Sequence, residues 1–151
     1  MKSKHGFKTT KKRSDLMRKI KSDNTKPELK LRKALWSVGI RYRVKNKDIF
    51  GKPDIAIRKY KLAVFVDGEF WHGFNWEEKK TKIKSNRDYW IQKIEGNMER
   101  DEKVNQKLRE NGWTVLRYWQ KEIKNNLDQC VSEIEAIINN SKSSLSKKPT
   151  T

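Results

Sequence analysis

The chain of 151 residues is poor in cysteine and in long apolar segments, and these absences exclude several classes of protein. It has one cysteine, Cys130, which excludes an intramolecular disulfide and a zinc site built from several cysteines. It also lacks the run of roughly 18 apolar residues that a membrane span needs. Its basic N-terminus is not followed by the apolar segment of a secretory signal. We therefore expect a soluble, intracellular protein of the cytoplasm.

Acidic residues are scarce relative to basic ones. The sequence has 37 Lys and Arg against 19 Asp and Glu, a formal net charge of +18 at pH 7. Such a charge repels itself in a compact chain, and a polyanionic partner relieves that repulsion. Release of counterions from nucleic acid is the most common use of such a surface, while an anionic membrane is the competing partner. Nucleic acid is the favoured partner.

The hydrophobic residues, 34% of the chain, are arranged as in one α/β domain. We predict a disordered basic arm at 1–12, a single domain at 13–140 and a disordered tail at 141–151. Apolar periodicity and turn residues predict helices at 24–38, 87–109 and 127–138, strands at 40–44, 54–57, 62–66 and 113–118, and an irregular segment at 68–85. This order predicts a small mixed β-sheet covered by helices.

Acidic residues stand at four positions where the pattern expects apolar ones. Glu28 lies three residues before Leu31 on the apolar stripe that Leu35 and Val38 continue in the first helix. Asp101 interrupts the stripe of the long helix, Asp54 opens one strand, and Asp67 closes the next. We therefore expect four carboxylates at the margins of one core.

Carboxylates brought together repel one another and raise their own pKa values unless a cation neutralises them. Oxygen ligands suit magnesium, and in phosphodiester hydrolysis a metal ion stabilises developing charge and activates water. That chemistry suits a basic protein whose substrate is a polyanion. Each acid taken singly is more often structural or solvated: Glu28 is also an ordinary first-turn acid, and Asp101 can pair with Arg100 or Lys103.

His72 is a candidate for proton transfer, because it follows the strand end that carries Asp67. Neutral imidazole can accept or deliver a proton near physiological pH, although a lone histidine is more often structural. The aromatic residues around it, Phe70, Trp71 and Trp76, are core residues in one interpretation. In the other they stack on DNA bases or wedge between them.

Six segments in order form a recognisable set. They are Arg13-Ser14-Asp15-Leu16-Met17, Asn24-Thr25-Lys26-Pro27-Glu28, Gly51-Lys52-Pro53-Asp54, Val64-Phe65-Val66-Asp67-Gly68-Glu69-Phe70-Trp71-His72-Gly73, Asn97-Met98-Glu99-Arg100-Asp101 and Gly112-Trp113-Thr114-Val115. With these segments the chain resembles the very-short-patch-repair (Vsr) DNA mismatch endonucleases over roughly residues 13–119.

The resemblance implies a fold similar to the type II restriction endonucleases, with a PD-(D/E)xK-type core and a Mg²⁺ site. Asp54 is then the principal metal ligand, and the main-chain carbonyl of Val66 is another. His72 is the implied proton-transfer residue, with Asp101 and Glu28 supporting water at the metal or orienting His72.

The resemblance also implies a substrate. The family nicks the strand that carries the mismatched T of a T·G pair, which arises when 5-methylcytosine deaminates. Phe70 and Trp71 would enter the base stack from the major groove and Met17 from the opposite groove, and Arg13 and Lys19 would be further DNA contacts. The implied partner is double-stranded DNA bound by a monomer, with mismatch-repair proteins as further partners.

The sequence departs from the family pattern in two places. Asp67 stands where the family can have a histidine, so its role shifts to positioning metal or phosphate. Glu69 and Lys121 occupy cysteine positions of a structural zinc site, and the neighbours of Gly73 lack its other ligands, so no structural zinc is predicted. Alternatively, Asp67-Gly68-Glu69 supplies the second acidic element of a more general nuclease motif, 13 residues after Asp54.

Three other functions stay open at this point. A restriction or defence endonuclease on the same fold would cut matched duplex DNA, although the Phe70-Trp71 pair favours mismatch binding. A non-catalytic DNA-binding module would keep the charge but not the joint presence of Glu28, Asp54, His72 and Asp101. An RNA-associated basic protein would explain the charge but not the acids.

Overall fold

A computed structural model describes residues 25–146 of the chain, and the predicted basic arm, Arg13, Met17, Lys19 and residues 147–151 lie outside this range. Its sheet has three strands in the order β1-β2-β3. β1 (Ile55–Ile57) runs antiparallel to β2 (Leu62–Asp67), and β2 runs parallel to β3 (Thr114–Trp119). The predicted mixed sheet is confirmed. A short 3₁₀ helix, η1 (Arg58–Tyr60), joins the first two strands.

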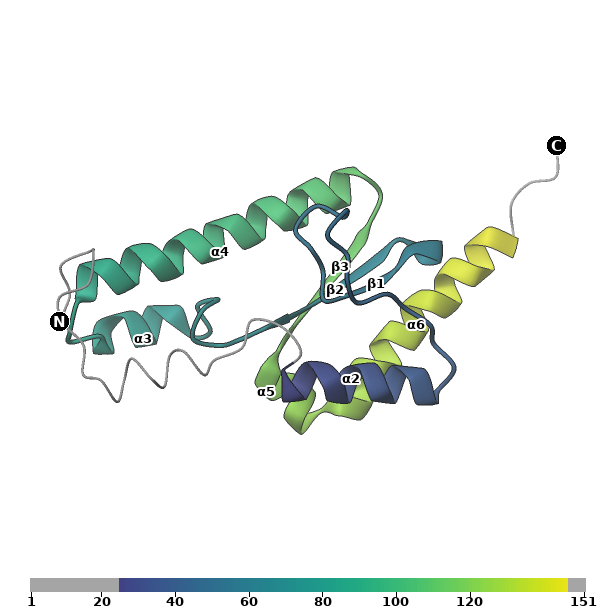
Figure 1. Ribbon diagram of the computed structural model, residues 1–151, viewed down its shortest axis with the longest axis horizontal. Helices are drawn as coiled ribbons and strands as arrows, with labels where there is room; N and C mark the ends of the chain where they lie inside the picture. Colours follow the sequence, from purple (N-terminus) through teal and green to yellow (C-terminus); the bar gives the residue numbers. More distant parts are fainter. Residues whose placement is uncertain (1–24, 147–151) are drawn as a thin grey trace.

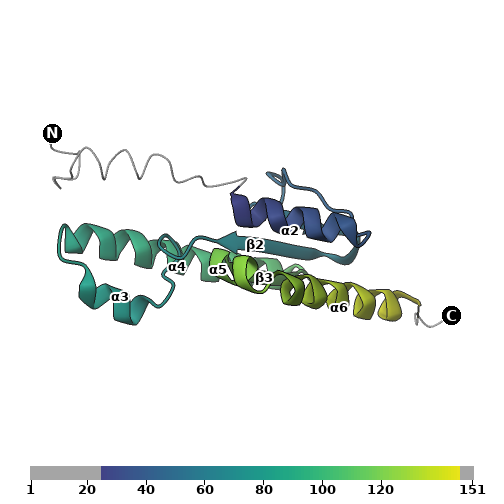
Figure 2. The same ribbon diagram turned by 90° about the horizontal axis from the view of Figure 1, so that it is seen from below.

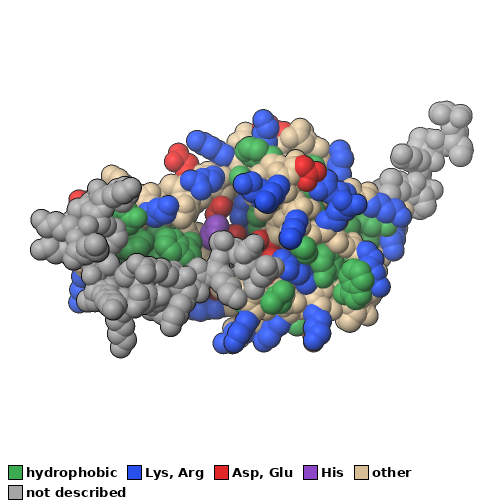
Figure 3. Space-filling view, viewed as in Figure 1, with side chains coloured by type: hydrophobic (Ala, Val, Ile, Leu, Met, Phe, Trp, Pro, Cys, Tyr) green, Lys and Arg blue, Asp and Glu red, His purple; other side chains and the backbone are tan. Residues whose placement is uncertain are grey.

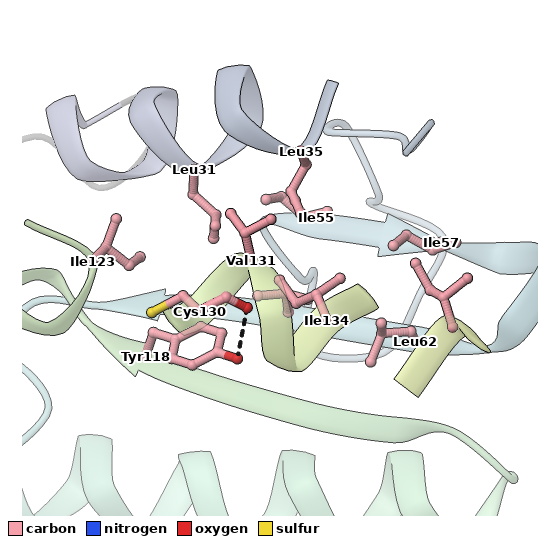
Figure 4. Packing of buried hydrophobic residues seen from close by; sticks show 12 residues of the cluster. Leu31, Leu35, Ile55, Ile57, Leu62, Tyr118, Ile123, Cys130, Val131 and Ile134 are labelled. Carbon is pink, nitrogen blue, oxygen red and sulfur yellow. Dashed lines mark hydrogen bonds between the residues drawn. The ribbon is translucent and has the colours of Figure 1, made fainter. Parts of the chain in front are cut away.

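Three helices cover one face of the sheet: α2 (Lys26–Ser37), α5 (Gln120–Asn125) and α6 (Leu127–Ser146) (Figures 1 and 2). Their apolar sides meet the strands in one buried cluster (Figure 4). It contains Leu31, Leu35, Ile55, Ile57, Leu62, Val64, Tyr118, Ile123, Cys130, Val131, Ile134 and Ile138. Each fully buried Leu or Ile there stabilises the fold by about 1.5–3 kcal/mol relative to an exposed one.

A long helix, α4 (Arg87–Glu110), covers the opposite face. Its C-terminal half packs Val104 and Leu108 against Phe65 of β2. Its N-terminal half extends beyond the sheet, where α3 (Trp76–Lys82) lies beside it (Figure 1). The indole Nε1 of Trp76 donates to Glu95 Oε2 at 2.9 Å and ties the two helices together. The crossover that a parallel strand pair requires is thus built from α3 and α4.

The strand predicted at 40–44 is wrong. Only Arg43 pairs with Ala56, as an isolated antiparallel bridge. The chain then leaves the sheet, because the side chain of Asn46 donates to the carbonyl of Arg43 at 2.8 Å and to that of Pro53 at 3.2 Å. Those bonds fold residues 43–53 into a loop rather than extending a ladder.

Three helix predictions also need correction. The segment 68–85 contains α3, and α5 follows β3 directly, although no helix was predicted at either place. α6 continues to Ser146 instead of ending near Ile138, so the predicted tail boundary at 141 is wrong. No Gly or Pro interrupts the chain between 139 and 146, so nothing stops the helix there. Val38, predicted on the buried stripe, is the C-cap of α2 and 49% exposed.

None of the helices within residues 25–146 has the length and apolar character needed to cross a membrane.

Candidate active site

The backbone before β1 is folded tightly enough to bring Asp54 to the edge of the sheet. Gly51 has a φ of 83°, and a Cβ atom at this position would overlap the side chain of Val104 on α4. Only glycine fits such a conformation at such a close approach. The buried amide of Asn46 then holds the carbonyl of Pro53, the residue directly before Asp54.

Asp54 is joined to the end of β2 through Val66. Its Oδ2 accepts a hydrogen bond from the backbone N–H of Val66 at 2.7 Å. The N–H and C=O of one strand residue point to the same side, so the carbonyl of Val66 is directed to the side on which Asp54 lies. The two residues predicted to bind metal are therefore neighbours.

The carboxyl group of Asp54 is electrostatically perturbed. Burial is the largest cause and raises its pKa, and the negative charges of Glu28 and Asp67 raise it further. The hydrogen bond from Val66 and the positive charge of Arg32 act in the opposite direction, and the resulting pKa is about 7. Without a bound cation, burial and the neighbouring acids therefore disfavour the ionised form of Asp54.

Glu28 is buried on α2, with 2% of its surface exposed. Its backbone N–H donates to the side chain of Thr25, the N-cap, and its carboxylate pairs with Arg32 one turn later. Glu28 was predicted at the margin of the core; it is buried, and its negative charge raises the pKa of Asp54. Among residues 25–146, its direct partner is Arg32 rather than His72.

Asp67, His72 and Asp101 form a second cluster next to the first. One ligand atom from each lies within 4.8 Å of the others, a spacing at which the three could hold a metal ion. His72 Nδ1 lies 2.6 Å from Asp101 Oδ2 and 3.8 Å from Asp67 Oδ1. Because a carboxylate only accepts, Nδ1 carries the hydrogen, and Nε2 is left as the nitrogen that can accept a proton.

The acids around His72 raise its pKa above the ordinary value of histidine. Burial is the largest single influence and lowers this pKa, but the hydrogen bond to Asp101 and the charges of Asp67 and Asp101 together outweigh it. Burial likewise raises the pKa of Asp67, against the opposing charges of Arg117 and His72. The cluster therefore favours a protonated, cationic His72 more than water does.

The sequence interpretation missed Arg117, which completes this cluster from β3. Its Nη1 lies 3.1 Å from both carboxylate oxygens of Asp67 and 3.5 Å from Asp101 Oδ1. Arg117 stands between Leu116 and Tyr118 in a largely apolar strand. It therefore interrupts an apolar pattern in the same way as the four acids do.

The two predicted wedge residues lie in an aromatic cluster that also contains Trp90 of α4. Phe70 and Trp71 meet edge to face with ring centroids 4.8 Å apart, and Trp90 lies 5.4 Å and 6.0 Å from them. Phe70 is 39% exposed, and Asn97 Nδ2 holds the carbonyl of Trp71 at 2.9 Å. Trp76, in contrast, is buried and belongs to the core, as one interpretation expected.

The loop that carries these residues, 68–75, is fixed at both ends. Glu69 Oε1 accepts a hydrogen bond from the backbone N–H of Lys121 at 2.6 Å, so the two positions that would hold zinc ligands in the family are linked directly. Gly73 packs on the side chain of Met98 of α4 and has a φ of 77°, a conformation that residues with a Cβ rarely adopt. The loop is therefore held against α4 and the start of α5.

Two cavities flank the loop. One, of about 280 Å³, is lined by the polar cluster, with Asp67, His72, Asp101, Asn105 and Arg117 in its wall. The other, of about 400 Å³, is lined by aromatic side chains and by lysines of α3 and the turn after it. On the face in Figure 3, Lys and Arg side chains cover much of the described surface, and acidic side chains lie recessed in a hollow near its middle.

The donor atoms separate into two sets with different metal preferences. Asp54 and the carbonyl of Val66 offer oxygen, which suits a hard divalent cation such as Mg²⁺. Asp67, Asp101 and His72 mix carboxylate with imidazole, a set that suits transition metals. Burial and the neighbouring acids disfavour the ionised form of Asp54, and a divalent cation would stabilise that form. The residues present therefore fit a divalent cation.

Comparisons with known proteins agree on one family. Residues 6–78 match the family model described as DNA mismatch endonuclease Vsr. Type II nicking enzyme V.NmeDIP of Neisseria meningitidis serogroup C is 48% identical over 139 residues, 92% of this chain and 93% of that protein. Type II nicking enzyme V.HpaIIP of Haemophilus parainfluenzae is 51% identical over 78% of this chain and 84% of its own length.

A further relative, DNA mismatch endonuclease Vsr of Escherichia coli (strain K12), is 33% identical over 72% of this chain and 69% of its own length. The identities, the long coverage and the named activities exclude a module without catalysis and an RNA-associated protein. The chain belongs to the Vsr DNA mismatch endonuclease family and is a strand-nicking DNA endonuclease.

Proposed function

We propose that this enzyme nicks double-stranded DNA at T·G mismatches, in very short patch mismatch repair, and that it requires Mg²⁺. The observation that carries the proposal is the pair formed at the start of β1 and the end of β2, where the carboxylate of Asp54 accepts a hydrogen bond from Val66 and has a pKa near neutrality. A buried carboxylate with that pKa, beside two further acids, is a group that a cation can stabilise. Its position at a strand end of a mixed sheet supports a restriction-endonuclease-like core.

In this proposal, Asp54 and the main-chain carbonyl of Val66 hold the metal. When bound, a divalent cation stabilises the charge that develops on the scissile phosphate and lowers the pKa of water. Glu28 adds negative charge to the same site and, through its pair with Arg32, is kept from moving toward the cation. Asp67 is a positioning residue between the two clusters.

His72 is the proposed proton-transfer residue. Asp101 orients the ring by accepting from Nδ1, so Nε2 is the atom that exchanges a proton with water or with the leaving oxygen. The raised pKa of His72 favours the protonated ring, the form that delivers a proton to a leaving group. The cavity of about 280 Å³ beside His72 admits water to the cluster.

The mismatch is read, in this proposal, by the loop that also carries the proton-transfer residue. Phe70 and Trp71 stand between Asp67 and His72 in the chain. Insertion of these two aromatic rings into the base stack would therefore place the side chains of Asp67 and His72 beside the same base step. Arg13, Met17 and Lys19 are proposed as further DNA contacts. We also propose that the enzyme acts as a monomer in the bacterial cytoplasm, alongside mismatch-repair proteins and without structural zinc.

The test is strand-resolved cleavage of end-labelled duplexes that carry either T·G or T·A at one position, in a pool of varied flanking sequence. We expect a nick only in the strand with the mismatched T and only when Mg²⁺ is present. Cleavage of both strands of matched DNA would contradict the proposal and assign the enzyme to the restriction class. Binding without cleavage in any context would contradict it as well.

A further inference from the structure

The cluster of Asp67, His72 and Asp101 has the spacing of a metal site, but a cation of the chain already lies among its oxygens. Arg117 Nη1 is 3.1 Å from each oxygen of Asp67 and 3.5 Å from Asp101 Oδ1. These are the same carboxylates that, with His72 Nδ1, lie within 4.8 Å of one another. A metal ion placed between them would meet a permanent positive charge at short range.

The guanidinium of Arg117 is fixed in place from other sides. Its Nε donates to Asn105 Oδ1 of α4 at 2.6 Å, and its central carbon lies 4.0 Å from the centroid of the Phe65 ring. Phe65 is the register partner of Arg117 across the β2–β3 pair. The side chain of Arg117 is only 18% exposed. Two elements, α4 and β2, therefore hold the guanidinium of Arg117 in place before any ligand binds.

We propose that Arg117 is the resident cation of this cluster. It is a positioning residue that holds Asp67 and Asp101 around His72, and it prevents the three side chains from binding a divalent ion. The metal of the proposed reaction is thereby restricted to the site at Asp54 and Val66, and His72 stays available for proton transfer. The kinetic part of this inference depends on the proposed function, whereas the metal-binding part does not.

The metal-binding test uses Co²⁺ as the probe, followed by visible absorption and titration calorimetry. The comparison is made in an Asp54→Ala background, so that the proposed magnesium site does not contribute. Asp54→Ala/Arg117→Met should bind one Co²⁺ at least about 10-fold more tightly than Asp54→Ala alone. Adding Asp101→Asn should remove the gain, and Asp54→Ala/Arg117→Lys should show none because it keeps the charge.

Two results would overturn the proposal. If Asp54→Ala alone binds Co²⁺ through His72 as tightly as the double variant does, Arg117 does not exclude metal from the cluster. A double variant that is folded by circular dichroism and gains no affinity would show that the cluster is not a latent site. If the double variant does not fold, the nicking kinetics of Arg117→Lys decide.

The kinetic test separates positioning from DNA contact. Arg117→Met should lower kcat for nicking at least about 10-fold while leaving KM for DNA close to that of Arg109→Met, a control that removes the same charge from an exposed helix end. Arg117→Lys should recover part of kcat. A raised KM with unchanged kcat would contradict the proposal and make Arg117 a DNA contact. Wild-type enzyme without nicking activity, together with a Co²⁺ gain, would refute the proposed function alone.

Discussion

At the scale of single residues, Asp54, Asp67 and Arg117 are charged groups in positions that strand packing would otherwise fill with apolar side chains. Asp54 and Asp67 have raised pKa values because burial disfavours their charged forms. Buried charges persist in proteins when a partner or a ligand compensates them. Arg117 compensates Asp67, and we propose that a divalent cation compensates Asp54.

The raised pKa of Asp54 predicts a pH-dependent gain in stability for Asp54→Asn in metal-free protein. The folded state holds a proton between the ordinary pKa of 3.8 and about 7 that the unfolded state has released, so this group lowers stability as pH rises through that window. Asn keeps an acceptor for the Val66 N–H and removes the charge. We expect a Tm increase on the order of 10 °C at pH 8 in EDTA, from a penalty of about 4 kcal/mol, and an increase roughly a third as large at pH 5, where only about one pKa unit of that window has been crossed.

The matched control is Asp48→Asn. Asp48 is exposed and paired with Arg58, which lowers its pKa, so its replacement should not raise Tm at pH 8. Mg²⁺ should narrow the difference between wild type and Asp54→Asn by stabilising the ionised carboxylate. An equal Tm for wild type and Asp54→Asn at pH 8 in EDTA would mean that ionisation of the Asp54 carboxyl group does not destabilise the folded protein.

The acids of the site could be predicted from the sequence because each breaks an apolar period, and that signal is local. The pairing of Asp67 with Arg117 could not, since it depends on the parallel register of β2 and β3 across 50 residues of chain. The contact of Trp90 with Phe70 and Trp71 could not be predicted either, because it depends on the placement of α4 beside the loop.

At the scale of elements, the loop 68–75 carries both the residues proposed for mismatch recognition and the residue proposed for proton transfer. It carries Phe70 and Trp71 at the aromatic cluster and His72 at the polar cluster, and both ends are fixed, at Glu69 and Gly73. Movement of this loop would displace the wedge and the proton-transfer residue together. Mismatch binding and cleavage are therefore expected to be coupled through one element.

This coupling predicts that Trp71→Ala weakens binding to T·G duplexes more than binding to matched duplexes. Loss of one stacking aromatic should cost about 1–3 kcal/mol at the mismatch. Fluorescence anisotropy at fixed salt measures both affinities. Trp36→Ala, which removes an exposed tryptophan from α2, is the control and should leave the ratio of the two affinities unchanged. Equal losses on both duplexes for Trp71→Ala would rule out the wedge.

Helices and strands with strong apolar periods were predictable as elements, whereas those defined by polar contacts were not. α2, α4, β2 and β3 lie close to their predicted ranges. The segment predicted as a strand at 40–44 pairs only at Arg43, after which the side-chain amide of Asn46 bonds to the carbonyls of Arg43 and Pro53 within a loop. α3 is rich in lysine and carries one buried aromatic, Trp76, so it has too weak an apolar stripe to stand out.

At the scale of the whole molecule, the chain has 37 basic and 19 acidic residues. On the face in Figure 3, Lys and Arg side chains of the described residues surround a hollow in which acidic side chains are recessed. A basic surface attracts the phosphate backbone, while the acids at the centre would repel it unless a cation is bound. Long-range attraction and local repulsion thus make metal binding and productive DNA binding mutually supportive.

The charge predicts a steep salt dependence of DNA binding. A surface that makes 6–10 phosphate contacts should lose about 10³–10⁵-fold in affinity between 50 and 200 mM salt. The loss should be similar for T·G and matched duplexes, because phosphates carry no sequence information. Affinities measured across a salt series give the slope, and a flat response would contradict the assignment of the basic surface to DNA.

The most direct test of the central claim is the cleavage and binding of one T·G duplex by wild-type enzyme and by Asp54→Ala, each with Mg²⁺ and with EDTA. We predict a nick only for wild type with Mg²⁺, and DNA binding by Asp54→Ala that is equal to or tighter than that of wild type, because the variant lacks an acid that repels phosphate. Nicking by Asp54→Ala, or nicking by wild type in EDTA, would contradict a metal-dependent reaction centred on Asp54.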